Sequence, residues 1–192
     1  MTARTQMAPG ATKLLSPTLR IAAVFAATLL LALSAHVQVP GYPVKISMQT
    51  AAVFAIGIAL GSRLGVAAVL AYIAEGLAGL PVFQNGAAGP AYLFGPTGGY
   101  LAGFVLAAFI AGRAAETGRM TSFAGSVAVL LVATIAIYAL GVAWLAILLG
   151  FEKAVAVGVL PFLFGDALKV LLVAGLVAAG VIRPLRRLAA RR

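Results

Sequence analysis

Long apolar runs, interrupted by short polar or glycine-rich segments, fill most of the chain. A helix needs about 20 apolar residues to cross the hydrocarbon core of a bilayer. The pattern therefore predicts an all-α integral membrane protein with six transmembrane helices, at Leu19–Val37, Met48–Gly61, Leu64–Leu80, Gly98–Arg113, Phe123–Leu149 and Gly165–Ile182. We expect an N-terminal cytoplasmic segment (1–18), a six-helix membrane domain (19–182) and a basic cytoplasmic tail (183–192).

The composition indicates a lipid environment. Hydrophobic residues make up 63% of the chain and charged residues 9%, whereas soluble domains are about half apolar and about a quarter charged. A net charge of +10 would suggest nucleic acid as the partner of a soluble protein. In a membrane protein it is better interpreted as a topology signal, so we expect lipid contacts and no nucleic-acid partner.

Basic residues lie mainly in alternate connections. Eleven fall on one predicted face: Arg4, Lys13, Arg20, Arg63, Arg113, Arg119, Arg183, Arg186, Arg187, Arg191 and Arg192. Lys45 and Lys153 fall on the other. Basic residues prefer the cytoplasmic side of a membrane, so both termini are expected in the cytoplasm of a bacterial cell with the chain in its inner membrane. A cleaved signal peptide ending at Ala32–Ala35 is the alternative, but it would leave five spans and break this charge balance.

The connections on the opposite side, at about 38–47, 81–97 and 150–164, contain most of the unusual residues. The second and fourth predicted helices are also short. Short or glycine-interrupted spans are tolerated where neighbouring protein or a cavity covers the loose backbone. We therefore expect a binding site that faces outward.

Residue types needed for several chemistries are missing from the sequence. There is no cysteine, one histidine and four acidic residues, so we expect no disulfide, no metal site and no cofactor. No Gly-Lys-Ser or Gly-Lys-Thr occurs, so ATP hydrolysis would have to come from another chain. Without paired carboxylates or a Ser/His constellation, we do not expect an enzyme.

The strongest chemical signal is Asp166 with Lys169 near the start of the sixth helix. Residues three apart share a helix face, so the opposite charges can pair. Ionisable groups at membrane depth are costly and usually face the bundle interior, where they serve function. Two structural readings stay open: a purely structural ion pair, or Asp166 as a helix N-cap with Lys169 reaching to the interface.

Four weaker signals have structural alternatives of their own. The glycines of Gly95–Tyr100 could cradle an anion at a helix start or could simply allow close packing. Asn85 could read a ligand with its amide or form an Asn-Gly turn. Glu75 could contact a ligand, carry a proton or be a neutral carboxyl bonded to a neighbouring helix. His36, the only histidine, is expected at the interface or as a helix cap.

Small residues form a stripe on the first predicted helix. Small side chains spaced four apart let two helices approach closely, either inside one fold or between proteins. The stripe is therefore a candidate partner interface, with internal packing as the alternative, and it consists of Ala22, Ala23, Ala26 and Ala27.

Several motifs together are similar to those of one transporter family. They are Val44–Thr50, Gly79–Phe83, Phe94–Tyr100, Leu160–Phe162 and Gly165-Asp166 followed by Lys169. With these motifs the chain resembles the BioY family, the biotin-specific substrate-binding (S) components of energy-coupling-factor transporters, over nearly its whole length. Glu75 departs from the pattern, because an apolar residue is expected there.

The resemblance implies a six-helix S-component fold that binds biotin at its outer face and works with a membrane T component and two ATPase subunits. It also implies a site in which Asp166 accepts a ureido N–H and Lys169, Asn85 and Tyr100 donate. Aromatic walls would come from Phe83, Tyr92, Phe94 and Phe164, with Gln49 and Lys45 where the first outer loop could close. An S component for another vitamin and a small proton-coupled carrier using Glu75 are the alternatives.

Overall fold

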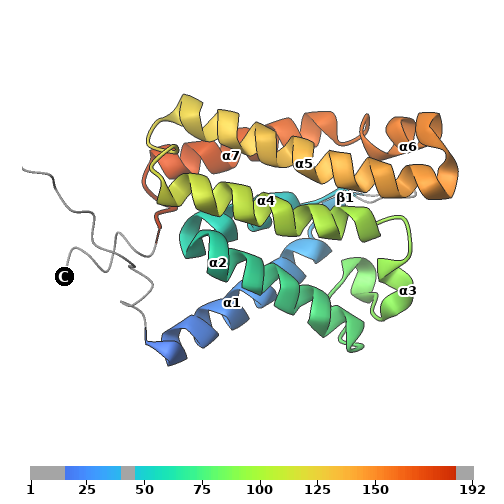
Figure 1. Cartoon of the computed structure of the whole chain (residues 1–192), viewed down its shortest axis with the longest axis horizontal. Coiled ribbons are helices and arrows are strands. Elements are labelled where there is room, and N and C mark those ends of the chain that lie inside the picture. Colours follow the sequence, from blue (N-terminus) through green and yellow to red (C-terminus); the bar gives the residue numbers. More distant parts are fainter. Residues whose placement is uncertain (1–15, 40–45, 185–192) are drawn as a thin grey trace, which may run out of the picture.

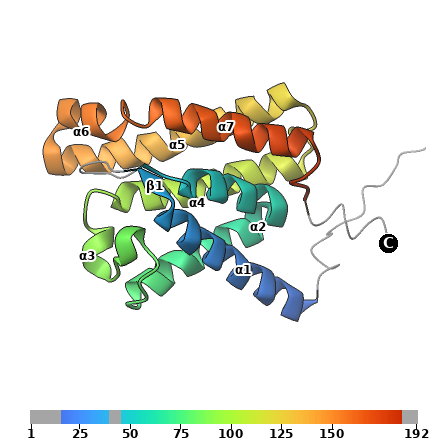
Figure 2. The same cartoon turned by 180° about the vertical axis from the view of Figure 1, so that it is seen from behind.

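The helices of the computed structural model alternate in direction between two ends of the bundle, and the N-terminal helix is inclined to the others (Figure 1, Figure 2). The structure describes residues 16–39 and 46–184. The long helices are α1 (Pro17–His36), α2 (Gln49–Leu77), α4 (Gly98–Glu116), α5 (Phe123–Leu149) and α7 (Leu163–Ala178). The short elements are β1 (Gln38–Val39), β2 (Ile46–Ser47), η2 (Gln84–Gly86), α3 (Pro90–Leu93) and α6 (Phe151–Gly158).

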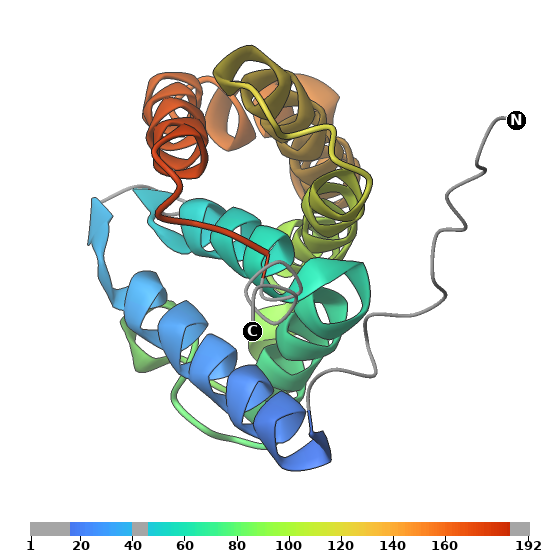
Figure 3. The same ribbon diagram turned by 90° about the vertical axis from the view of Figure 1, so that its left-hand side faces the viewer.

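Helix α2 is two helices joined at Gly61. This residue has φ 82° and ψ 175°, outside the helical region, and only glycine adopts that conformation without strong strain. A Cβ on Gly65 would lie 3.0 Å from the Cα of Gly57, so the two halves fold back on each other (Figure 3). The carboxylate of Glu116 accepts hydrogen bonds from Ser62 N and Ser62 Oγ, both at 3.0 Å, at the start of the second half. The change of direction therefore falls where the second and third helices were predicted to meet.

Glycine lets α2, α4 and α5 pack with their backbones close together. A Cβ on Gly57 would lie 2.6 Å from the carbonyl oxygen of Ala108 on α4, and one on Gly103 would lie 2.7 Å from the Cα of Ile137 on α5. Close backbone approach increases the van der Waals contact between apolar transmembrane helices, which is a main source of their association. These contacts fix α4 between α2 and α5.

Most predicted helix boundaries agree with the structure to within a few residues. Helix α5 matches its prediction, because Ser122 Oγ caps its first turn at Gly125 N and Gly150, at φ 82°, ends it. Helix α4 extends three residues past Arg113 to Glu116. The larger correction is α6, which occupies a stretch predicted as an outer loop.

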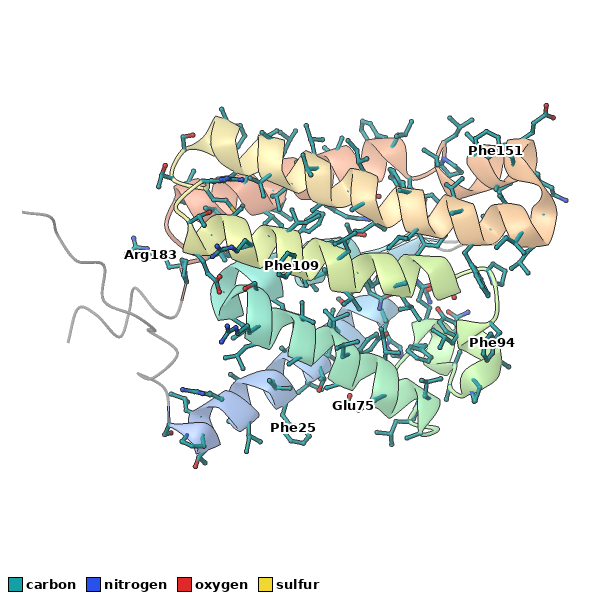
Figure 4. All side chains as sticks on the ribbon, in the orientation of Figure 1. Phe25, Glu75, Phe94, Phe109, Phe151 and Arg183 are labelled. Atoms are coloured by element: carbon teal, nitrogen blue, oxygen red, sulfur yellow. The ribbon has the colours of Figure 1, made fainter. Side chains whose placement is uncertain are left out.

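The two ends of the bundle differ in charge. The start of α1, the bend of α2, the end of α4 and the residues after α7 lie at one end of the bundle, which we call the arginine end (Figure 1). These segments and the connection after α4 contain Arg20, Arg63, Arg113, Arg119 and Arg183, of which Arg183 is labelled in Figure 4. By length and hydropathy α1, α2, α4 and α5 could each cross a membrane, and α6 with α7, bent by 50°, could form a fifth span. The structure thus confirms an all-α fold of membrane-spanning character, while the count of six spans stays a prediction.

Candidate functional site

A buried cavity lies at the end of the bundle opposite the arginine end, where β2, η2 and the starts of α2, α4 and α7 meet. Its polar lining includes Ser47, Gln49, Thr50, Gln84 and Thr97, and its aromatic lining includes Tyr92, Tyr100, Phe104, Tyr138 and Phe162. Asp166 and Lys169 complete the polar side. A few convergent polar groups on aromatic walls are typical of a small-molecule site.

Asp166 and Lys169 form a buried ion pair in this cavity. Lys169 Nζ lies 2.7 Å from Asp166 Oδ1, and the two side chains are 8% and 6% exposed. Phe162 precedes α7 at the cap position, and Lys169 is buried, so the reading of Asp166 as an N-cap with Lys169 at the interface is wrong. An ion pair costs more desolvation free energy when it is buried than when it lies at the surface. Because this pair faces a cavity, its remaining lone pairs and protons are available to a ligand.

Tyr138 supplies a second donor to the same carboxylate. Its hydroxyl, from the middle of α5, donates to Asp166 Oδ2 at 2.6 Å. Asp166 is therefore held between a phenol of α5 and the ammonium of Lys169. Because an ionised carboxylate has about four lone-pair sites, it can still accept a hydrogen bond from a ligand.

Gln49 is fixed by a network that joins four segments. Its Oε1 accepts from Ser47 Oγ and Gln84 Nε2, both at 3.2 Å, and its Nε2 donates to Tyr72 OH at 2.8 Å. Tyr72 OH in turn donates to the carbonyl oxygen of Val82 at 3.0 Å. The network sets the direction in which the Gln49 amide faces the cavity.

An aromatic stack supports the wall behind Tyr92. The rings of Phe83 and Tyr92 stack at 4.5 Å, and Phe83 meets Tyr72 edge to face at 5.5 Å. Phe83 is fully buried and lies against Gly76, where a Cβ would collide with its ring. Phe83 therefore supports the cavity wall from behind. Burial also raises the pKa of the Tyr92 phenol above its ordinary value.

Tyr100 lines the cavity with its ring, but its hydroxyl is already bonded. It donates to the carbonyl oxygen of Gly158 at the end of α6 at 2.8 Å. Nearby, a Cβ on Gly98 would collide with the carbonyl oxygen of Leu93, and one on Gly99 would lie 2.4 Å from that of Leu140. The glycines of this motif therefore serve close packing, which was the structural alternative to an anion cradle.

Besides Phe83, three predicted site residues do not line the cavity. Asn85 has φ 61° in a tight turn and accepts a hydrogen bond from Gln38 Nε2, as the Asn-Gly turn reading expected. Phe94 is 67% exposed and Phe164 is 78% exposed, and neither lines the cavity. Phe164 lies about 200° around α7 from Asp166, and Phe94 follows α3 with an exposed side chain, so the expectation of a wall residue is corrected for both. Lys45 lies outside the described residues.

Glu75 and His36 also lie away from the cavity. The half-buried carboxylate of Glu75, labelled in Figure 4, makes no hydrogen bond or ion pair with another residue of the described ranges. His36 Nδ1 lies 2.8 Å from the carbonyl oxygen of Ala32, so this histidine sits at the exposed end of α1 as predicted.

The alanine stripe divides into two parts. Ala23, Ala26 and Ala27 line a groove of about 590 Å³ with the first half of α2 and residues 180–183. Ala27 is buried against the core, whereas Ala22 is exposed and does not line the groove. The stripe thus contributes both to internal packing and to an open surface.

Two residues of the cavity lining, Tyr138 and Gln84, are not among those predicted from the sequence. Tyr138 is a lone phenol in the middle of a long apolar helix, and this is a sequence signal for a site residue. Whether its side chain faces the cavity depends on how α5 is rotated, which the sequence alone does not give. Gln84 directly precedes Asn85, and in this structure Gln84 lines the cavity whereas Asn85 does not. No group of three metal-ligating side chains occurs within residues 16–39 and 46–184.

The model of the BioY family matches residues 5–187. The chain belongs to the BioY family. This confirms the resemblance inferred from the motifs between Val44 and Lys169.

Other members of the BioY family are similar over most of their length. The biotin transporter BioY of Thermotoga maritima is 41% identical over 152 residues, covering 79% of this chain and 88% of the relative. The probable biotin transporter BioY of Pyrococcus horikoshii is 39% identical over 141 residues, covering 73% and 82%. The crystal structure of the S-component for biotin from an ECF-type ABC transporter has the same fold, with a TM-score of 0.74 and 24% identity over 86% of this chain and 93% of that one.

Proposed function

We propose that this chain binds biotin in the cavity between α2, α4, α5 and α7 and is the substrate-binding S component of an energy-coupling-factor transporter. The observation that carries the proposal is the buried Asp166–Lys169 pair, which faces an aromatic cavity together with Tyr138. The BioY-family relatives, described as biotin transporters, support the choice of ligand.

The chemistry of the lining suits biotin. Its ureido ring carries two N–H donors and one carbonyl acceptor, and its thioether ring needs apolar contact. Asp166 accepts a ureido N–H, Lys169 donates, and Tyr92, Tyr100 and Phe104 pack against the rings. Gln49 and Gln84, which are hydrogen-bonded to each other, add amide groups to the same cavity.

In this proposal the arginine end faces the cytoplasm of a bacterial cell and the cavity faces outward. The groove beside Ala23 and Ala26 receives a helix of the T component, since small residues allow close helix contact. Two ATPase subunits supply the energy, consistent with a sequence that lacks a Gly-Lys-Ser/Thr motif. Glu75 does not line the cavity, so no observation favours the carrier reading.

Calorimetry on detergent-purified protein tests the proposal. The wild-type chain should bind biotin, and Asp166→Asn should weaken binding about ten-fold to a hundred-fold, because a hydrogen bond to a charged group contributes about 1.5–3 kcal/mol. Lys169→Met keeps most of the apolar stem and should also weaken binding. Glu152→Gln and Lys153→Met are matched controls, because these exposed residues of α6 lie at the same end of the bundle.

Mass spectrometry of the copurified ligand adds a second readout. A different bound vitamin would contradict the assignment of biotin while leaving the site intact. Unchanged affinity in both site variants, with a large loss of thermal stability, would make the pair structural only. Uptake by the chain alone that follows a pH gradient and depends on Glu75 would support the carrier instead.

A further inference from the structure

A second concave surface lies near the arginine end, remote from the cavity. It is a groove of about 420 Å³ between α4 and α5, which run side by side (Figure 1). Its apolar walls are Phe109, Ile110 and Ala114 of α4 and Ala128, Val129 and Val132 of α5. Arg113, Thr117 and Arg119 lie around it where α4 ends and the connection to α5 begins. We call this surface the α4–α5 groove.

The two arginines leave positive charge open to a ligand. Arg113 has a side chain that is 62% exposed, and its ion pair with Glu116 is long, at 3.7 Å. The carboxylate of Glu116 is also engaged by Ser62 N and Oγ. Arg119 is exposed, and its side chain makes no hydrogen bond or ion pair with a residue of the described ranges.

The apolar walls extend from these charges into the membrane-spanning part of the bundle. Val132 lies nine residues into α5, or about 14 Å from its first residue at a rise of about 1.5 Å per residue. Phe109, labelled in Figure 4, and Val132 are both exposed. An inorganic anion would use only the arginines and would leave these walls uncovered. A ligand that fits both parts has an anionic head and a long apolar chain.

We propose that the α4–α5 groove binds one anionic phospholipid of the surrounding leaflet. The phosphate lies between Arg113 and Arg119, and one acyl chain lies against Phe109, Ile110 and Val132. Basic pockets between transmembrane helices are known to hold anionic head groups. Charge complementarity at one end and apolar contact along the rest select a lipid over a soluble phosphate.

Native mass spectrometry of the full chain tests the proposal, with phosphatidylglycerol as the probe and phosphatidylcholine as the uncharged comparison. The wild-type chain should retain phosphatidylglycerol preferentially. Arg119→Gln should weaken its binding about five-fold, and the double variant with Arg113→Gln about 25-fold, since each arginine near a lipid head contributes a similar favourable amount. Arg63→Gln is the matched control, because Arg63 is exposed at the same end but does not line the groove.

The apolar half of the groove needs its own variant. Ala128→Phe fills the groove without changing charge, and it should lower lipid retention, while Ala139→Phe on an exposed part of α5 outside the groove should not. Biotin binding by calorimetry confirms that each variant is folded.

Three results would overturn the proposal. An equal loss with Arg63→Gln would mean diffuse attraction to the whole arginine end. If inorganic phosphate at matched concentration displaced the lipid, the groove would be an anion site in which the acyl chain plays no part. If Ala128→Phe left lipid retention unchanged but lowered the yield of the complex with a T component, the groove would belong to a partner protein.

Discussion

The hydroxyl of Tyr138 on α5 donates a 2.6 Å hydrogen bond to the Oδ2 atom of Asp166 on α7. The bond joins the middle of one helix to the first turn of another across the cavity wall. It leaves the Asp166 carboxylate in one orientation, with Lys169 on its other oxygen. A ligand donor therefore meets a carboxylate whose direction is already set.

Tyr138→Phe should weaken biotin binding by up to about ten-fold, because it frees the Asp166 carboxylate to rotate and the ligand must then order that side chain, at a cost of about 0.5–1.5 kcal/mol. Tyr100→Phe is the control, since its hydroxyl donates to the Gly158 carbonyl and not to the ion pair. That variant should lower stability more than affinity. Calorimetry and thermal unfolding separate the two effects. Wild-type affinity in Tyr138→Phe would exclude an orienting role for this phenol.

Gly61→Ala should destabilise the protein strongly. At φ 82° and ψ 175° an alanine carries strain of about 1–3 kcal/mol, and its Cβ would lie 2.5 Å from Oε1 of Glu116. Gly175→Ala is the matched control, because nothing lies within 4 Å of a Cβ there, and a helical Gly→Ala change is neutral or stabilises by up to about 1 kcal/mol. Thermal unfolding in detergent should show a lower midpoint for Gly61→Ala only. Equal midpoints would mean that α2 can be straightened at this residue.

Neighbouring alanines of α1 should respond differently to leucine. Ala26→Leu fills the groove beside α2, so it should reduce biotin uptake by the complete transporter while biotin affinity of the chain stays unchanged. Ala22→Leu, on an exposed position outside the groove, should leave uptake unchanged. Ala27→Leu overpacks a buried position and should cost about 1–3 kcal/mol of stability. If Ala26→Leu lowered affinity and uptake equally, the groove would not be a partner surface.

Cysteine labelling tests the topology directly, since the chain has no cysteine of its own. A membrane-impermeant thiol reagent added to intact cells should label Lys153→Cys, on exposed α6 at the cavity end, and should not label Leu188→Cys in the basic tail. Opening the cells should make position 188 reactive. Labelling at 188 from outside would reverse the proposed orientation.

The sequence was sufficient for features that depend on local spacing. The contact between Asp166 and Lys169 follows from their three-residue separation on one helix, and the ends of α5 follow from Ser122 and Gly150. Helix α6 is not predicted, because eight residues are too few for a span and the segment lies between Gly150 and Pro161 and ends at Gly158.

Side-chain direction was harder to predict than residue type. Phe94 and Phe164 have aromatic rings of the type expected in a cavity wall, but their positions on the backbone leave both side chains exposed. Tyr138 turns inward only because close glycine contacts between α4 and α5 set the rotation of α5. Such contacts join residues far apart in the chain, so no local pattern in the sequence predicts them.

The size of the cavity predicts how the proposed ligand enters it. Its space is about 40 Å³, whereas pockets for small molecules typically measure about 300–1,000 Å³. Side chains that wall the site must therefore separate before biotin can occupy it. If association waits for this opening, we expect the observed rate of binding to level off at high biotin concentration and to stay below the limit set by diffusion.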